Sequence, residues 1–234
     1  MNLPDASLTP ALIWGGNIVF AGALAVAGLR APWSRLEGGH SHVYFGACTV
    51  LSLLWLMGAG IEPGLSVHLL GTVLLVLMFD LPLGLIGSAA LLVVATLSGR
   101  GGWAAFGANG LAMCLLPALV GRGLLRVAWR WLPDNFFVYI YVNSFLAGGV
   151  SMAVAGLANA ALLWFSGTYD GEHLTGHYLV LFPMLAFAEA FLTGGAAAIF
   201  AVYRPEWVMT FDDARYLRNR PTPRRPHDEP PMPE

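Results

Sequence analysis

Long apolar stretches, separated by short polar or glycine-rich segments, run along most of the chain. They cover approximately residues 11–29, 43–61, 67–79, 82–98, 104–121, 136–166 and 176–202. A helix needs about 17 to 25 predominantly apolar residues to cross a bilayer, and all of these stretches except the third reach that length. The pattern predicts an all-α, polytopic integral membrane protein with seven transmembrane helices.

The third and fourth stretches read without interruption as VHLLGTVLLVLMFDLPLGLIGSAALLVVATLS. Asp80 and Pro82 lie in the middle of this segment, where a charge is expensive in lipid and a proline breaks the helical hydrogen bonds. We therefore predict two short helices rather than one long tilted helix. Asp80 is expected in a structural turn at the cytoplasmic end, where water can solvate its carboxylate.

Composition supports a membrane protein. Hydrophobic residues make up 57% of the 234 residues, charged residues only 11%, and the mean hydropathy is +0.65. Soluble domains carry about 25% charged residues, so a soluble class is excluded. The net charge of −2 gives no indication of nucleic-acid binding.

The positions of the arginines predict the orientation, because cytoplasmic loops hold the excess of positive charge. None of the 12 basic residues is a lysine. Seven spans with the N-terminus outside and the C-terminus in the cytoplasm leave only Arg100 outside. A single helix across residues 67–98 would place at most 9 of the 12 inside, so seven spans fit better.

We expect residues 1–205 to form one membrane domain and residues 206–234 a cytoplasmic tail. The tail mixes arginines, acidic residues and, near its end, many prolines, so we expect disorder from about residue 221. The segment before the first apolar stretch has no Lys or Arg, unlike a secretory signal, and is expected to be retained.

Ionisable side chains within apolar spans are candidates for function, because burying each one costs a few kcal/mol. His68 is expected to begin the third helix at its outer end. Glu189, near the middle of the last helix, must find an arginine, a protein hydrogen bond or a proton, so a structural role and a substrate or proton role both remain open. Asn109 lies between Gly107 and Gly110 and is a candidate for shaping the outer pocket.

Two further histidines lie in the outer segment YDGEHLTGHY. If this segment were helical, His173 and His177 would share one face and form a possible metal pair. We expect a loop instead, in which both are solvated.

The chain lacks the motifs of common enzymes. It has no G-x-x-x-x-G-K-[ST] phosphate loop, no HExxH and no nucleophile beside a base. It is therefore expected to be a non-enzymatic subunit, and any coupled ATP hydrolysis would belong to separate proteins.

Four segments of the sequence resemble the CbiM/NikM-type membrane subunits that capture the substrate in cobalt and nickel energy-coupling-factor (ECF) ABC transporters. They are MNLPDASLTP at the start, PGLSVHLLGT at the third span, GANGLAM in the fifth span and EAFLTG in the last. The resemblance extends from residue 1 to about 205. It implies seven helices, an outer N-terminus and one Ni(II) or Co(II) held almost entirely by nitrogen.

The resemblance also implies which residues hold the metal. In that family the ligands are the amine of the first residue, the amide and imidazole of a histidine at position two, and the histidine that opens the third span. Carried over, these positions are Met1, Asn2 and His68, with Asn109 shaping the pocket.

The departure from the family is Asn2, whose amide oxygen replaces an imidazole nitrogen. Affinity should fall and the preference among Ni(II), Co(II) and Cu(II) should change. Other ligands could complete a different outer site, and the candidates are Asp5, His173, His177 or water.

Two functions are compatible with the resemblance to this family and with Asn2 in place of its histidine. The first is a substrate-binding subunit in the bacterial plasma (inner) membrane, in contact with lipid, that works with a scaffold transmembrane protein and ATPases to take up a divalent transition metal. The alternative is a repurposed accessory subunit of a larger membrane complex, such as a copper-linked oxidase or oxygenase, without transport activity.

Overall fold

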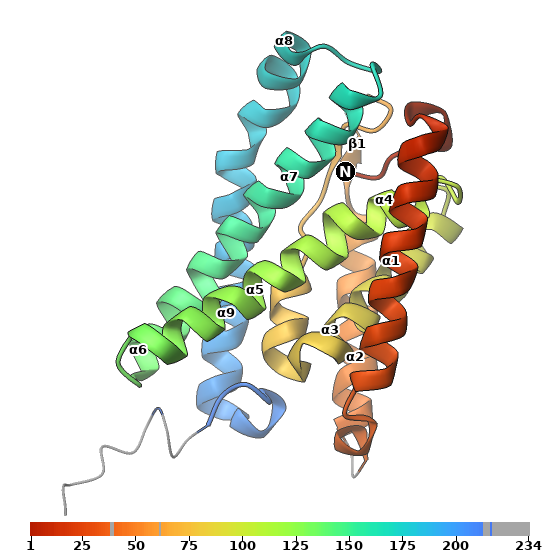
Figure 1. The fold of residues 1–234 in the computed structure, drawn as a ribbon. Coiled ribbons are helices and arrows are strands. Elements are labelled where there is room, and N and C mark those ends of the chain that lie inside the picture. Colours follow the sequence, from red (N-terminus) through yellow and green to blue (C-terminus); the bar gives the residue numbers. More distant parts are fainter. Residues whose placement is uncertain (38–39, 61, 213–215, 217–234) are drawn as a thin grey trace, which may run out of the picture.

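Long apolar helices run side by side through most of the protein (Figure 1). The computed structural model describes residues 1–37, 40–60, 62–212 and 216. The α-helices are α1 (Pro10–Arg30), α2 (His40–Leu56), α3 (Thr72–Leu97), α4 (Phe106–Gly110), α5 (Leu116–Trp131), α6 (Phe136–Val138), α7 (Ala147–Phe165), α8 (Gly171–His173) and α9 (Phe182–Tyr203).

Short segments of other helical types join some of these helices into longer rods. The π-helical segments are η3 (Leu111–Leu115), η4 (Tyr139–Leu146) and η5 (Leu174–Tyr178), and η6 (Leu179–Leu181) is a 3₁₀ turn. Three further 3₁₀ turns are η1 (Asp5–Ser7), η2 (Trp33–Leu36) and η7 (Pro205–Trp207). Five of the described helices are long and apolar enough to cross a membrane: Pro10–Arg30, Thr72–Leu97, Phe106–Trp131, Phe136–Phe165 and Gly171–Tyr203.

The break predicted between the third and fourth apolar stretches is present. Asp80 has φ 64° and ψ 167°, a non-helical conformation in the middle of α3. A Cβ on Gly84 would lie 2.8 Å from the backbone nitrogen of Val76, so the two halves of α3 fold back against each other. The Asp80 carboxylate accepts the N–H of Leu81 at 2.8 Å and pairs with Arg122 at 2.8 Å, which stabilises the turn.

The connection between α2 and α3 differs from the prediction. The sequence predicts that the second span ends at residue 61 and that the third begins at residue 67. In the structure, α2 ends at Leu56 and α3 begins at Thr72. Between them, β1 (Ala59–Gly60) pairs antiparallel with β2 (Ser66–Val67). His68 therefore lies in an extended segment four residues ahead of α3 instead of opening the helix.

The last long helix, Gly171–Tyr203, begins earlier than expected. The segment with His173 and His177 is helical, so the expected loop is wrong. Asp170 explains the early start, because its side chain accepts the N–H of His173 at 2.7 Å and caps the first turn.

Residues after α9 pack against the break in α3. The N–H of Met209 donates to the carbonyl of Met78 at 2.9 Å, and the Thr210 hydroxyl donates to the carbonyl of Leu77 at 2.6 Å. The segment expected to be disordered from about residue 221 lies outside the described residues.

Candidate metal site

The N-terminal segment folds into the protein instead of extending away from it. The side chains of Met1 and Leu3 are fully buried, and Asn2 is 5% exposed. The turn η1 then leads to α1, in which Pro10 occupies the first position. In Figure 1 the N-terminus lies at the same end of the molecule as β1 and the start of α4.

Asn109 holds this segment through the backbone of Leu3. Its Oδ1 accepts the N–H of Leu3 at 2.8 Å, and its Nδ2 donates to the carbonyl of Leu3 at 3.1 Å. The same carbonyl accepts the N–H of Gly102 at 3.0 Å. Two side-chain bonds to one residue fix the position and the direction of the N-terminal segment.

Asp5 lies in the turn η1, and its carboxylate holds that turn to the loop before α4. Its Oδ1 accepts the N–H of Ala105 at 2.9 Å. A Cβ on Gly102 would overlap the Asp5 carboxylate, so the loop approaches closely only because it has a glycine there.

Ser66 organises the first two residues, and sequence reasoning missed it. The Met1 amine donates to the Ser66 carbonyl, and also to the Ser66 Oγ at 2.9 Å. The N–H of Asn2 donates to the same Oγ at 3.1 Å. The available signal was the spacing in SVH, because residues i and i+2 of an extended segment face the same side.

His68 presents one free ring nitrogen to this region. Its Nδ1 lies 3.0 Å from the carbonyl of Leu69, which can only accept, so Nδ1 carries the proton and Nε2 holds the lone pair. The ring packs 4.8 Å from that of Trp55, whose Nε1 donates to the carbonyl of Leu70 at 2.8 Å. Trp55 is a second residue of the site that sequence reasoning missed.

Two polar atoms here are buried and have no hydrogen-bond partner among the described residues: Asn2 Oδ1 and His68 Nε2. Leaving a buried polar atom unsatisfied costs about 1–3 kcal/mol. An amide oxygen and an imidazole nitrogen are both ligands for divalent transition metals.

The protonation of the site also suits a metal. Burial lowers the pKa of the Met1 amine from 8.0 to about 4. Burial, with the positive charge of the nearby amine and a smaller effect of Arg100, lowers the pKa of His68 from 6.5 to about 3, against the opposing hydrogen bond to Leu69. The amine and the imidazole are therefore neutral at pH 7, and a metal need not displace a proton from either.

Glu189 reaches this region from α9. It is fully buried, and its two oxygens accept the N–H groups of Leu70 at 2.7 Å and Gly71 at 2.8 Å. The hydroxyl of Thr193 lies 3.4 Å from Oε1. The sequence left an arginine, a protein hydrogen bond or a proton open as the partner of Glu189. In the structure, its partners are hydrogen-bond donors of the protein.

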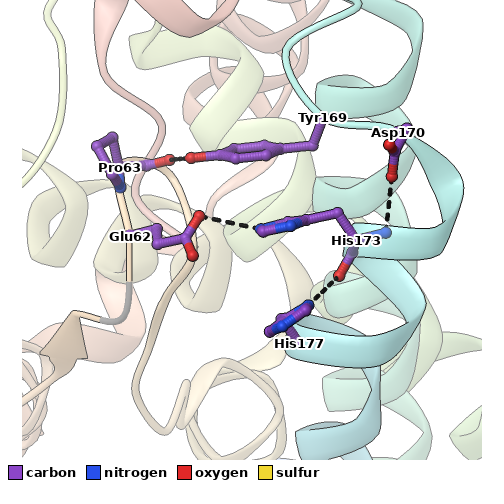
Figure 2. Close-up of polar contacts among 6 residues, drawn as sticks. All are labelled: Glu62, Pro63, Tyr169, Asp170, His173 and His177. Carbon is purple, nitrogen blue, oxygen red and sulfur yellow. Dashed lines mark hydrogen bonds and ion pairs between the residues drawn. The ribbon is translucent and has the colours of Figure 1, made fainter.

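His173 and His177 belong to a separate cluster (Figure 2). His173 Nε2 lies 3.0 Å from Glu62 Oε2, and the hydroxyl of Tyr169 donates to the carbonyl of Pro63 at 3.1 Å. The rings of His173 and His177 stack with centroids 4.5 Å apart. The cluster ties the β1–β2 connection to the start of the last rod.

The structure thus brings together Met1, Asn2, His68 and Asn109. The side chains of Asp5 and His173 bond elsewhere, to the N–H of Ala105 and to Glu62. Within the described part of the chain, no group of three or more His, Cys, Asp or Glu side chains could hold a metal ion. The N-terminal constellation differs from such a group because it uses the terminal amine and an amide.

Similar proteins are named as metal transporters. A putative metal transport protein of Haloquadratum walsbyi is 26% identical over 223 residues, covering 90% of this chain and 94% of that protein. A probable fused nickel transport protein, LarMN, of Lactiplantibacillus plantarum is 26% identical over 206 residues, covering 86% of this chain and 62% of that protein.

Solved structures share the fold. A structure described as a transition metal transporter covers 85% of this chain and 92% of its own, and a truncated form covers 86% and 98%; each has a TM-score of 0.73 at 21% identity. Residues 2–207 match CbiM, the family described as the cobalt uptake substrate-specific transmembrane region. Because this match covers nearly the whole chain, the protein belongs to the CbiM family of membrane metal transport proteins.

Proposed function

We propose that the protein is the substrate-capture subunit of an ECF-type transporter that takes up a divalent transition metal of the cobalt and nickel class. It crosses the bacterial plasma membrane seven times, with its N-terminus outside. The observation that carries the proposal is the buried set of Met1 amine, Asn2 amide and His68 imidazole, in which two atoms lack partners among the residues that the structure describes.

The ligands would be the Met1 amine, the backbone nitrogen of Asn2 after it has lost its proton to solvent, Oδ1 of Asn2 and Nε2 of His68. Asn Oδ1 and His Nδ1 are the same number of bonds from the backbone nitrogen. Asn2 can therefore close the same six-membered chelate ring as the family's histidine. The donor set becomes three nitrogens and one oxygen.

This substitution changes the metal preference. Four nitrogen donors in a plane suit Ni(II) and Cu(II), whereas oxygen donors suit ions that accept octahedral coordination with water. The site is thus expected to bind Ni(II) less tightly than an all-nitrogen site and to discriminate less between Ni(II) and Co(II). Asn109 and Glu189 shape the pocket without binding the metal.

Other proteins supply the energy. The sequence contains no phosphate loop, so the ATPases and the scaffold transmembrane protein of such a transporter would be separate chains. The replacement of histidine by Asn2 favours one second candidate, an accessory subunit of another membrane complex. Affinity purification separates the two: recovery with ATPases supports transport, and recovery with an oxidase or oxygenase supports the accessory role.

Equilibrium binding of Ni(II) and Co(II) to the purified protein tests the site, after intact mass has shown that the chain begins at Met1. The wild-type protein should bind about one ion at micromolar metal, and His68→Ala should lower the affinity at least about tenfold. His42→Ala is the control, because His42 is exposed in α2. A wild-type protein that retains neither metal would overturn the proposal.

A further inference from the structure

A buried carboxylate from α9 meets the backbone at the start of α3. The two oxygens of Glu189 accept the consecutive N–H groups of Leu70 and Gly71. Gly71 has φ +64° and is the N-cap of α3. The free N–H groups and positive partial charge of a helix start stabilise an anion there, and hydrogen bonds to a carboxylate are roughly twice as strong as neutral ones.

The same peptide group contacts both Glu189 and His68. The N–H of Leu70 and the carbonyl of Leu69 belong to one planar peptide unit. Glu189 Oε2 accepts from that N–H at 2.7 Å, and His68 Nδ1 lies 3.0 Å from that carbonyl. The carboxylate, the peptide and the imidazole therefore form a continuous chain of hydrogen bonds that ends at the free Nε2.

Trp55 holds the next carbonyl along the chain. Its indole N–H donates to the carbonyl of Leu70 at 2.8 Å, while its ring packs against His68. Glu189 of α9 thus fixes the Leu69–Leu70 peptide, which orients His68, through the N–H of Leu70. Trp55 of α2 fixes the carbonyl of Leu70.

We propose that Glu189 is a positioning residue for the metal ligand His68, acting through the Leu69–Leu70 peptide; this inference rests on the proposed function. Histidine ligands commonly donate their second ring N–H to a carboxylate or a carbonyl, which sets the ring orientation and raises its strength as a ligand. Here the Leu69 carbonyl accepts the hydrogen bond from His68 Nδ1. Glu189 accepts the N–H of the same peptide, which polarises that carbonyl and fixes its position.

Glu189→Gln tests the inference, because glutamine keeps the shape but turns one acceptor oxygen into an NH₂ donor. The affinity for Ni(II) and Co(II) should fall about 10- to 100-fold, and the visible absorption bands of the bound metal should shift as His68 becomes a weaker ligand. Ser88→Ala is the matched control. It removes a buried hydroxyl whose hydrogen bond, among the described residues, stays within α3 at the carbonyl of Gly84, and it should leave the bands unchanged.

The outcomes distinguish this inference from the proposed function. Normal affinity and unchanged bands in Glu189→Gln would overturn the inference while the proposed function stands. Absence of metal from the wild-type protein would overturn both. If Glu189→Gln does not fold, hydrogen exchange of the metal-free wild-type protein decides: slow exchange at Leu70 and Gly71 supports the inference, and fast exchange overturns it.

Discussion

At the scale of single residues, position 2 sets the chemistry of the candidate site. The Oδ1 atom of Asn2 is buried without a partner among the described atoms, whereas the backbone N–H of Asn2 donates to Ser66 Oγ. The side chain is therefore available to a metal, but as an oxygen donor. The preference for one metal over another depends on this atom.

Restoring a nitrogen donor should strengthen the site. Asn2→His should raise the Ni(II) affinity by at least about tenfold, because imidazole suits Ni(II) better than an amide oxygen does. Calorimetry gives the affinity, and the visible spectrum should move toward that of planar four-nitrogen Ni(II). Asn135→His is the control, because Asn135 is exposed and caps α6. Equal effects of the two substitutions would rule out Asn2 as a ligand.

Asn109 should govern whether the N-terminal segment stays in place. Asn109→Ala removes both side-chain bonds to Leu3, and each lost partner in a buried site costs about 1–3 kcal/mol. Hydrogen exchange of residues 1–9 should become faster, and metal affinity should fall. Asn143→Ala is a matched control, since Asn143 is also buried but its side chain has no partner in the described part of the chain. Unchanged exchange in Asn109→Ala would contradict this role.

Part of this site could be predicted from the sequence. His68 and Glu189 could be selected because ionisable groups in apolar spans are rare and costly. Ser66 and Trp55 could not, because a serine and a tryptophan near a membrane boundary are common and their role depends on which backbone groups they meet. The Leu69–Leu70 peptide carries no sequence signal at all.

At the scale of elements, α1 and α4 approach closely through glycines. A Cβ on Gly107 would overlap the backbone of Asn17, and the Asn17 side chain bonds to the N–H of Gly107 and the carbonyl of Ala104, each at 2.8 Å. This contact sets the position of Asn109 in the same helix. The packing of two elements thereby determines where the N-terminal segment is held.

Gly107→Ala should separate these helices. Overpacking against backbone atoms that cannot rotate away typically costs about 1–3 kcal/mol. The midpoint of thermal unfolding in detergent should fall, and metal affinity should fall with it. Gly123→Ala is the control, because a Cβ there meets nothing within 4 Å and should be neutral or stabilise α5 by up to about 1 kcal/mol. Equal midpoints for the two variants would refute the close packing.

Element boundaries show which parts of the fold the sequence determines. The break at Asp80 was predictable, because a charge and a proline within lipid have few compatible structures. The start of α3 was not, because apolar residues such as Leu69 and Leu70 fit a helix and a buried extended segment equally well. Glu189 stabilises the non-helical segment, because it accepts the two N–H groups immediately before the helix.

At the scale of the whole molecule, α3 joins the two ends. Its start is adjacent to the candidate metal site, and its break at Asp80 contacts Arg122, with the residues after α9 packed just before the break. Helix α9, which carries Glu189, contacts α3 and leads to the residues that pack before the break. Displacement of α9 by a partner would therefore move the carboxylate that holds the His68 segment.

The number of crossings can be tested by the side on which Ser98 lies. If α3 folds back at Asp80 without crossing as one helix, the loop after it returns to the side of the N-terminus. The structure supports this, because Arg100 Nη1 donates to the carbonyl of Gly58 at 2.8 Å and Gly102 bonds to Leu3. A single straight crossing would put Ser98 on the opposite side.

Single-cysteine labelling of whole cells measures this directly, on a background in which Cys48 and Cys114 are replaced by alanine. An impermeant maleimide should label Ser98→Cys and Glu172→Cys in intact cells but Glu37→Cys only after the cells are opened, since all three positions are exposed in the structure. Labelling of Ser98→Cys and Glu37→Cys under the same condition would contradict seven crossings, which place these two positions on opposite sides of the membrane. Labelling of Glu37→Cys alone in intact cells would reverse the orientation and place the metal site on the cytoplasmic side, which is incompatible with uptake.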